Sequence, residues 1–451
     1  MLDKTSNIPL YLQIANIIKE NILSKKYFYG QKLPSLRYLC KEFGVNISTV
    51  TNALKLLQDQ GFVKAVRNVG YFISYSEKDD ISSFEDFISQ NIPKNAIDFA
   101  SGNLPYSLYP IDEFKHSLDI VINKFGASAF DYIENKNSPL IEYLLENYLK
   151  SQNIYCKLEN IIIVSGAQQG IEIVSKSFLK PGDKILIENP TYFGAYSTFR
   201  SMHLDIDDFP TGNIEFLEYK MKRFKPKALY IIPFSQNPTG FTYSIDELKW
   251  IYELSYKNNV FIIEDDFFSD VNIFDDVNFM PIKSIDYKEI VFYVKSFSRL
   301  LMPALRLGFV ISPSNLSEDV AFLKWTTDIS TSLFIQLSFT EFLNRYYAIH
   351  LNRIKEYIKP KYNLFLNTIL KNSYYIPQKP TGIFSVVSTK NLNAISLYNT
   401  LKQYNIYVSP YNLFYHNINN SNFIRLSFMN TEIKDIVNGL HTIFEIIKNF
   451  Q

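Results

Sequence analysis

The sequence has very little cysteine. Only Cys40 and Cys156 occur among its 451 residues. Two cysteines exclude a disulfide framework and a thiolate-rich metal site, and they are typical of a protein from a reducing compartment. We therefore expect neither disulfides nor a metal centre.

Long hydrophobic runs are also absent. No apolar stretch approaches the length of a membrane span, and the first ten residues, MLDKTSNIPL, lack the apolar core of a signal peptide. We expect a cytoplasmic protein without a membrane partner. Apolar residues make up 47% of the chain and charged residues 20%, which is enough for buried cores and too little charge for a disordered chain. The length indicates two or three domains.

The chain as a whole has no excess of either charge, with 46 basic and 45 acidic side chains. The basic residues are unevenly placed, because residues 1–75 contain ten Lys or Arg and four Asp or Glu, a net charge of +6. A polyanionic partner is therefore expected only for this N-terminal segment.

The N-terminal segment has the pattern of three helices followed by a small hairpin. Apolar residues recur at spacings of three and four in the helical stretches, and short β-rich runs follow them. The predicted elements are helices at 9–21 and 35–43, a third helix between Gly44 and Gly61, and strands at 62–66 and 70–74. This order predicts a winged helix-turn-helix over residues 1–75.

The third helix is the expected DNA-reading element. Its apolar residues, from Val50 to Leu57, share one face, so that hydroxyl, amide and ammonium groups remain on the other and can meet phosphates and base edges. The predicted DNA-contacting residues are Arg37, Ser48, Thr49, Thr51, Asn52, Lys55 and Arg67. On charge alone, a helical module with a solvated polar face explains the pattern equally well.

Three motifs favour the DNA-binding interpretation. They are LPSLRYLCKEFGV, STVTNALKLLQDQGFV and GYFI. Together they resemble the DNA-binding domain of GntR-type bacterial regulators, which implies operator DNA as a partner. One position departs from that pattern, because such domains commonly carry Ser-Arg where this chain has Asn46 and Ile47. A phosphate-contacting arginine is thus missing, and Arg37 and Arg67 remain as the expected backbone contacts.

A change in composition separates a second, larger domain. Residues 76–96 are acidic and contain serine, and we predict a linker there with a short helix at 84–88. Over 97–451, β-branched runs alternate with helical patterns, which indicates an α/β domain with a mostly parallel sheet covered on both faces. We place a large subdomain at about 97–345 and a smaller α+β subdomain at about 346–451. The predicted strands are 161–164, 185–188, 228–232, 260–264 and 290–294.

Small, amide and acidic residues follow these strands, where open α/β sheets bind ligands. Each group alone is ordinary turn chemistry. Their order is specific, in the stretches SGAQQGIEIV, ENPTYFG, QNPTG, IIEDDF, SFSRLLMPALRLGFV and FIRLSF. This set resembles the fold-type I enzymes that use pyridoxal 5′-phosphate, the aminotransferase superfamily. With its N-terminal module, the whole chain resembles a MocR-type regulator of the GntR family.

The resemblance implies a role for each motif residue. The implied contacts of the cofactor phosphate are Gly166, Ala167, Ser296, Ser298 and Arg306, with Tyr132 reaching the phosphate of a partner subunit. The implied ring contacts are Tyr192 for stacking, Asn237 for the hydroxyl and Asp265 for the nitrogen. The implied substrate or effector contacts are Arg425, which binds a carboxylate, and Gly102 at the entrance.

One position breaks the family pattern. The family places a lysine seven residues before the phosphate arginine, and this chain has Arg299 there. Lysine bonds to the cofactor because a neutral amine has a free lone pair, whereas a guanidinium keeps its proton and delocalises that pair. Ordinary transamination is therefore not expected. Lys295, four residues upstream, is the remaining candidate for a covalent bond.

Two further departures accompany the first. Phe267 and Phe268 stand where relatives carry a tyrosine that donates to the cofactor hydroxyl, and the loop at 135–139 reads NKNSP instead of Asp-Pro-x-Gly. The pocket thus retains its anion-binding ends and loses its reactive middle.

Three states of the pocket remain open. Pyridoxal phosphate, its amine form or an amino-acid adduct binds noncovalently; another anionic ligand has replaced it; or the domain is only a dimerisation scaffold. Our leading hypothesis is a dimeric transcription regulator whose catalytically disabled aminotransferase-like domain senses a small anionic metabolite. The rivals are an active aminotransferase that uses Lys295 and a ligand-independent DNA-binding dimer.

Overall fold

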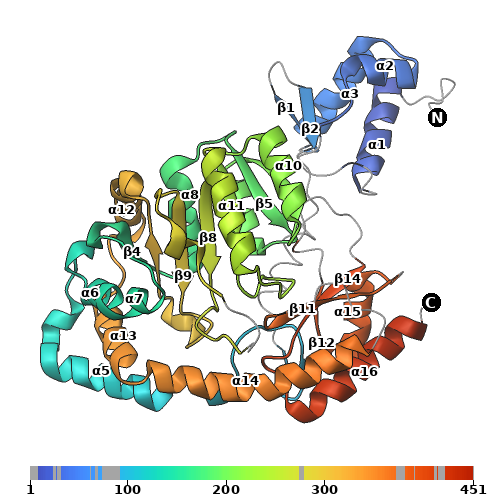
Figure 1. The fold of residues 1–451 in the computed structure, drawn as a ribbon. Helices are drawn as coiled ribbons and strands as arrows, with labels where there is room; N and C mark the ends of the chain where they lie inside the picture. The colour runs from blue at the N-terminus through green and yellow to red at the C-terminus, as the bar shows by residue number, and fades with distance from the viewer. Residues whose placement is uncertain are drawn as a thin grey trace. The chain divides into compact units, whose positions relative to one another are not determined.

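The computed structural model describes residues 9–23, 27, 32–60, 62–66, 70–73, 92–273, 279–371, 381–390, 392–410, 414 and 422–449. Three predicted features lie outside these residues, namely the Arg67 contact, the helix end at Gly61 and the linker helix at 84–88. The chain divides into two compact units, Met1–Asn91 and Ile92–Gln451, which are described separately (Figure 1).

The N-terminal unit is a three-helix module with a two-stranded antiparallel sheet. Its elements are α1 (Leu10–Leu23), α2 (Leu36–Phe43), α3 (Ile47–Asp59), β1 (Val63–Val66) and β2 (Gly70–Ile73). Ser35 caps α2 by accepting a hydrogen bond from the Tyr38 amide at 3.2 Å. Gly44 ends the helix with φ 63°, a left-handed conformation that favours glycine. Side chains from all three helices and both strands share one core, so the unit folds as the predicted winged helix-turn-helix.

The larger unit is built on a seven-stranded sheet in the order β4-β10-β9-β8-β7-β5-β6. Only β10 runs antiparallel to its neighbours, so the mostly parallel sheet is confirmed. The strands are β4 (Ile161–Val164), β5 (Lys184–Asn189), β6 (Asp205–Pro210), β7 (Ala228–Ile231), β8 (Phe261–Asp266), β9 (Val291–Ser296) and β10 (Gly308–Ile311). β6 and β10 were not among the strands predicted from the sequence.

Helices cover both faces of this sheet, since successive strand residues enter different cores. In β8, Ile263 packs in the core that contains α8 and α9, whereas Ile262 packs with α10 and α11. The helices are α5 (Ile111–Phe125), α6 (Pro139–Tyr143), α7 (Leu149–Ser151), α8 (Ala167–Phe178), α9 (Phe193–Ser201), α10 (Ile214–Phe224), α11 (Ile245–Lys257), α12 (Ser317–Asp328) and α13 (Leu333–Arg345). None of the helices in the described residues is long and apolar enough to cross a membrane.

A smaller α+β part completes the unit. The long helix α14 (Tyr347–Leu370) leads from the large sheet toward it, and Figure 1 shows α14 beside α16. Its other elements are β11 (Phe384–Ser388), α15 (Ala394–Gln403), β12 (Ile406–Tyr407), β13 (Ser409–Pro410), β14 (Phe423–Ser427) and α16 (Ile433–Asn449). β3 (Ile97–Asp98), at the start of the unit, pairs in parallel with β12. This pairing brings the segment after residue 98 next to β14.

Candidate functional site

The candidate pocket forms where the parallel strands end. β5, β7, β8 and β9 run in one direction, and β4 shares it because β4 and β9 are both antiparallel to β10. The loops after these strands therefore meet at one edge of the sheet. This edge is where open α/β sheets bind ligands.

One end of the pocket is rich in hydrogen-bond donors. Gly166, with φ 86°, precedes α8, whose first backbone N–H groups have no partner within the helix. Arg306 Nη2 donates to the Ser165 carbonyl at 3.1 Å, and a Cβ atom on Gly166 would lie 2.9 Å from the same nitrogen. Ser298 Oγ is buried and has no hydrogen-bond partner among the described residues. A helix N-terminus beside an arginine is a site suited to phosphate.

Asp265, near the end of β8, supplies the buried acid of the pocket and is 3% exposed. Its Oδ2 accepts a hydrogen bond from the Tyr230 hydroxyl at 2.6 Å, while its Oδ1 has no partner in the described part of the chain. Burial raises the pKa of Asp265 to about 7, which the Tyr230 hydrogen bond opposes. A buried carboxylate oxygen without a donor suits a cationic or N–H group of a ligand.

Tyr192 is half-buried beside these groups. It precedes α9, and burial raises the pKa of its hydroxyl. The charges of Arg299, Asp265 and Arg306 all act on that hydroxyl. Tyr192 thus borders both the donor-rich end and the acid.

Arg425 on β14 forms the opposite end. Its Nη1 donates to Asn237 Oδ1 at 2.9 Å, and its Nη2 donates to the Ala100 carbonyl at 2.6 Å and to Ser409 Oγ at 2.9 Å. The guanidinium lies over the Phe384 ring, 4.5 Å from its centroid. Burial lowers the pKa of Arg425 to about 9.

Arg299 extends toward the same end. Its Nη1 donates to Asn103 Oδ1 at 3.2 Å, and its guanidinium lies 5.7 Å from the ring centroids of both Phe267 and Phe384. A Cβ atom on Gly102 would lie 2.8 Å from Nη1, so glycine at this position leaves room for Arg299. Burial lowers the pKa of Arg299, whereas Tyr192 and Asp265 act to raise it.

Lys295 lies on the other face of β9. Val294 packs against Gly170 of α8, and strand residues alternate between faces, so Lys295 points away from α8. Its Nζ forms buried ion pairs with Asp266 at 3.1 Å and with Asp270 at 2.6 Å. Burial lowers the pKa of Lys295, but the two carboxylates outweigh this effect and raise it overall.

Most of the pocket residues predicted from the sequence meet at this edge, with two exceptions. Ser296 Oγ accepts a hydrogen bond from the Ser298 amide at 3.2 Å and thus turns toward its own loop. Tyr132 is 83% exposed on the surface of the single chain. Sequence reasoning missed Tyr230, because it lies in the apolar strand ALYI, and Asn103 and Phe384, which no motif contains.

The predicted DNA-contacting face of α3 is accessible. Ser48, Asn52 and Lys55 are exposed, Thr49 and Thr51 are half-buried, and Arg37 on α2 is exposed. Asn46, which the sequence analysis treated only as a departure, caps α3 by accepting a hydrogen bond from the Thr49 amide at 3.0 Å.

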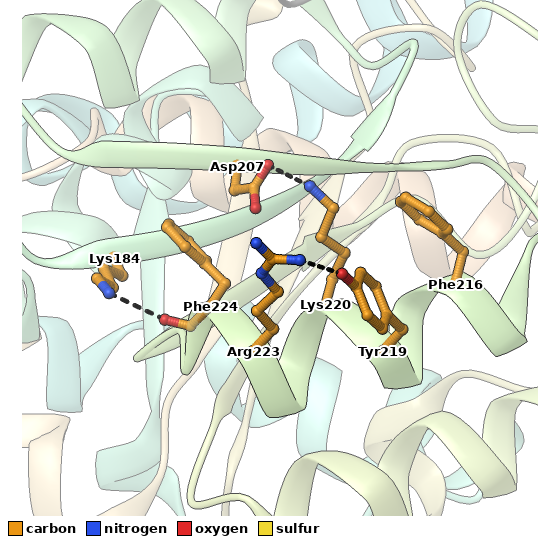
Figure 2. Close-up of a pocket in the computed structure, with 7 residues that line it drawn as sticks. All are labelled: Lys184, Asp207, Phe216, Tyr219, Lys220, Arg223 and Phe224. Atoms are coloured by element: carbon orange, nitrogen blue, oxygen red, sulfur yellow. Dashed lines mark hydrogen bonds and ion pairs between the residues drawn. The ribbon is translucent and has the colours of Figure 1, made fainter.

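A separate surface hollow of about 560 Å³ lies between the start of β5, strand β6 and α10 (Figure 2). Its cations are already engaged: Lys220 pairs with Asp207 at 2.6 Å, and Lys184 donates to the Phe224 carbonyl at 3.1 Å. Arg223 donates to the Tyr219 hydroxyl. Since Lys184 begins its strand, the hollow is remote from the strand ends that form the pocket.

Known proteins resemble this chain along most of its length. It is 27% identical to the uncharacterized HTH-type transcriptional regulator YdfD of Bacillus subtilis, covering 99% of this chain and 98% of the relative. It is 26% identical to the HTH-type transcriptional regulator NorG of Staphylococcus aureus, covering 92% and 99%.

Solved aminotransferases share the fold of the larger unit. Pyrococcus horikoshii kynurenine aminotransferase matches with a TM-score of 0.75 at 24% identity, covering 83% of this chain and 95% of that one. Thermus thermophilus LysN, an alpha-aminoadipate aminotransferase solved with N-(5′-phosphopyridoxyl)-L-leucine, matches with a TM-score of 0.73 at 23% identity, covering 80% and 94%.

Two family models divide the chain between them. Residues 10–73 match the bacterial regulatory proteins of the gntR family, and residues 94–443 match aminotransferase class I and II. The chain therefore belongs to the aminotransferase class I and II family and carries a GntR-type DNA-binding domain ahead of it, the architecture of MocR-type transcription regulators.

Proposed function

We propose that this DNA-binding transcription regulator uses its aminotransferase-like domain as a noncovalent sensor of a small anionic ligand, and not as an enzyme. The observation that carries the proposal is Arg299, at the motif position where the family has its reactive lysine. A guanidinium stays protonated at neutral pH and has no free lone pair for a carbonyl carbon. Its neighbours Asn103, Phe267 and Phe384 offer no base to deprotonate it.

Lys295 is a poor substitute for the missing amine. Its two buried carboxylate partners hold it protonated on the face of β9 that points away from α8. Attack on a carbonyl would require loss of the proton and rupture of both ion pairs, which leaves two buried charges uncompensated. This arrangement supports a structural role for Lys295.

The remaining pocket residues fit pyridoxal phosphate or its amine form. Asp265 Oδ1 is buried without a donor, as a carboxylate that awaits a protonated ring nitrogen would be. Ser298 Oγ, Arg306 and the start of α8 offer a phosphate site, and Tyr192 offers a stacking surface. When bound to a covalently competent enzyme, this cofactor supplies an electron sink. Here the residues would bind and orient it.

The regulator would act as a dimer on paired DNA half-sites. Phe130 and Tyr132 are large exposed side chains, 67% and 83% accessible, close together in the sequence. Burial of such surface favours association, and a two-fold dimer would match a two-fold operator. The ligand changes DNA affinity only if it binds one arrangement of the domains more tightly than another.

A covalent-capture experiment tests the disabled pocket. Pyridoxal phosphate is added to the full chain, borohydride is added, and the modified peptides are mapped by mass spectrometry. We expect no fixed label in the wild type and a label at residue 299 in Arg299→Lys. A label on Lys295 in the wild type would instead establish the aminotransferase rival.

A binding experiment tests the sensor. Pyridoxamine 5′-phosphate, an amine that needs no covalent bond, is titrated by calorimetry, and operator affinity is measured with and without it. We expect binding, together with an operator affinity that changes by about 5- to 150-fold, the usual size of coupling between two sites. Tight operator binding that no phosphopyridoxyl compound alters would favour the ligand-independent dimer.

A further inference from the structure

Two guanidinium groups converge on one short segment of the pocket, and this inference rests on the proposed sensor function. Arg425 Nη2 donates to the Ala100 carbonyl at 2.6 Å, and Arg299 Nη1 donates to Asn103 Oδ1 at 3.2 Å. Both cations also contact the Phe384 ring, at 4.5 Å and 5.7 Å from its centroid. The segment from Ala100 to Asn103 thus has one arginine at each end.

The two like charges oppose each other. Arg299 contributes to the lowered pKa of Arg425, after the larger effect of burial. The direct contacts of Arg299 among the described residues are an amide and two rings, none of which carries negative charge. Two nearby cations in a partly buried site bind anions strongly, because an anion relieves their repulsion and gains attraction from both.

A single carboxylate on a ligand would satisfy the Arg425 end, where the family binds carboxylates. A second acidic group would be required for Arg299, which reaches the loop at Gly102 and Asn103 from β9's side of the pocket. Arg306 and the start of α8 remain for a phosphate at the far end. The sensor would therefore discriminate ligands by the number of their acidic groups.

We propose that Arg299 is a specificity-determining residue that selects a phosphate-bearing ligand with two carboxylates, of the class formed by a phosphopyridoxyl group joined to an acidic amino acid. The position that is chemically inert as a nucleophile thereby becomes an anion-recognition group. Ligands with a neutral side chain bind more weakly, since they leave one guanidinium without a counter-charge.

The test compares two probes that differ in one charged group. N-(5′-phosphopyridoxyl)-L-glutamate and N-(5′-phosphopyridoxyl)-L-glutamine have nearly the same shape, and their C–N bond is stable, so no covalent reaction with the protein intervenes. Calorimetry on the full-length wild type is expected to show at least about tenfold tighter binding of the glutamate conjugate, the usual value of a charge-assisted hydrogen bond.

Variants assign the preference to its residue. Arg299→Met is expected to lose the preference while it still binds the glutamine conjugate, and Arg299→Lys is expected to retain part of it because the charge remains. Arg223→Met, which removes an arginine from the remote hollow of Figure 2, is expected to keep the full preference. Thermal unfolding and operator binding verify that each variant is folded.

The outcomes separate this inference from the proposed function. Equal affinities of the wild type for the two conjugates, or an undiminished preference in Arg299→Met, would overturn the role of Arg299 and leave the sensor intact. No binding of either conjugate or of pyridoxamine 5′-phosphate would overturn both.

Discussion

Three carboxyl groups are buried near the ends of the parallel strands, and one of them differs from the others. Glu188 and Glu264 each have both oxygens hydrogen-bonded, to Ile232 and Tyr243 and to the amides of Ile282 and Lys283. Asp265 has a donor to only one oxygen within the described residues. A protein that needed these acids only for its own stability would satisfy all of them. The unsatisfied oxygen marks Asp265 as the acid kept for a ligand.

Asp265 should make the ligand-free protein less stable as pH rises. Its folded-state pKa of about 7 lies above the 3.8 of an ordinary aspartate, so the folded state binds the proton more tightly and stability falls between about pH 4 and 7. Asp265→Asn removes this cost. The free energy of unfolding of the variant, relative to wild type, should rise by about 2–4 kcal/mol from pH 4.5 to pH 8. Both tryptophans, Trp250 and Trp325, lie in this unit, so fluorescence during urea unfolding measures it.

The same substitution should act oppositely on the ligand. Asp265→Asn cannot hold a protonated ring nitrogen as strongly, and pyridoxamine 5′-phosphate should bind at least about tenfold more weakly. A pH-independent stability difference, or unchanged affinity, would contradict the role given to Asp265.

On the DNA-binding domain, two exposed residues should affect binding differently. Arg37→Ala should weaken binding to all duplexes and lower the salt slope by about one, because a phosphate contact is lost. Asn52→Ala should change sequence preference, since an amide on the exposed face of α3 can read a base edge. Anisotropy titrations with the operator and a scrambled duplex at several salt concentrations separate the two. Equal loss on both duplexes in Asn52→Ala would make that residue a backbone contact.

Helix α3 depends on a cap that its motif does not predict. The Asn46 side chain accepts from the Thr49 amide at 3.0 Å and from the Thr49 and Ser48 hydroxyls at 2.6 and 2.9 Å. Where relatives commonly carry a serine cap, asparagine serves equally well. It also holds two hydroxyls predicted to face DNA.

Loss of this cap should loosen α3. Asn46→Ala should cost about 1 kcal/mol, so amides of Ile47–Asp59 should exchange hydrogen about fivefold faster by mass spectrometry. Asn52→Ala is the matched control, because it removes an exposed asparagine from the helix interior and alanine favours helix there. Similar acceleration in both variants would mean that Asn46 is not the cap in solution.

The elements themselves were largely predictable, because their signals are local. β4 begins and ends at the predicted residues, and the Gly44 turn follows from its glycine. β6 escaped prediction because this edge strand, DIDDFP, is mostly polar and only Phe209 is fully buried. Lys295 illustrates the limit for the site. Spacing placed it near the pocket, whereas the alternation of β9 directs it to Asp266 and Asp270. Which face a strand residue takes depends on pairings distant in sequence.

At the scale of the whole molecule, sensing requires that two copies of the chain and two DNA half-sites act together. The GntR-type domain of one chain carries the charge to bind DNA, but a lone half-site offers few contacts. A dimer converts the second half-site into an intramolecular event, which raises affinity by about 10²-fold or more when the spacing fits. The ligand domain would then control DNA affinity by controlling the disposition of the two copies.

Disruption of the dimer should therefore remove the advantage of paired half-sites and spare the single-site affinity. Phe130 is 67% exposed and stacks on Phe334 at 4.8 Å between centroids, so Phe130→Glu adds a charge to exposed apolar surface with little effect on folding. Analytical ultracentrifugation should show a monomer, and anisotropy should show equal affinity for one and two half-sites. Tyr404→Glu, at a position 58% exposed on the smaller subdomain, should leave both properties unchanged. A monomeric variant that kept the paired-site advantage would show that association through this surface does not serve DNA binding.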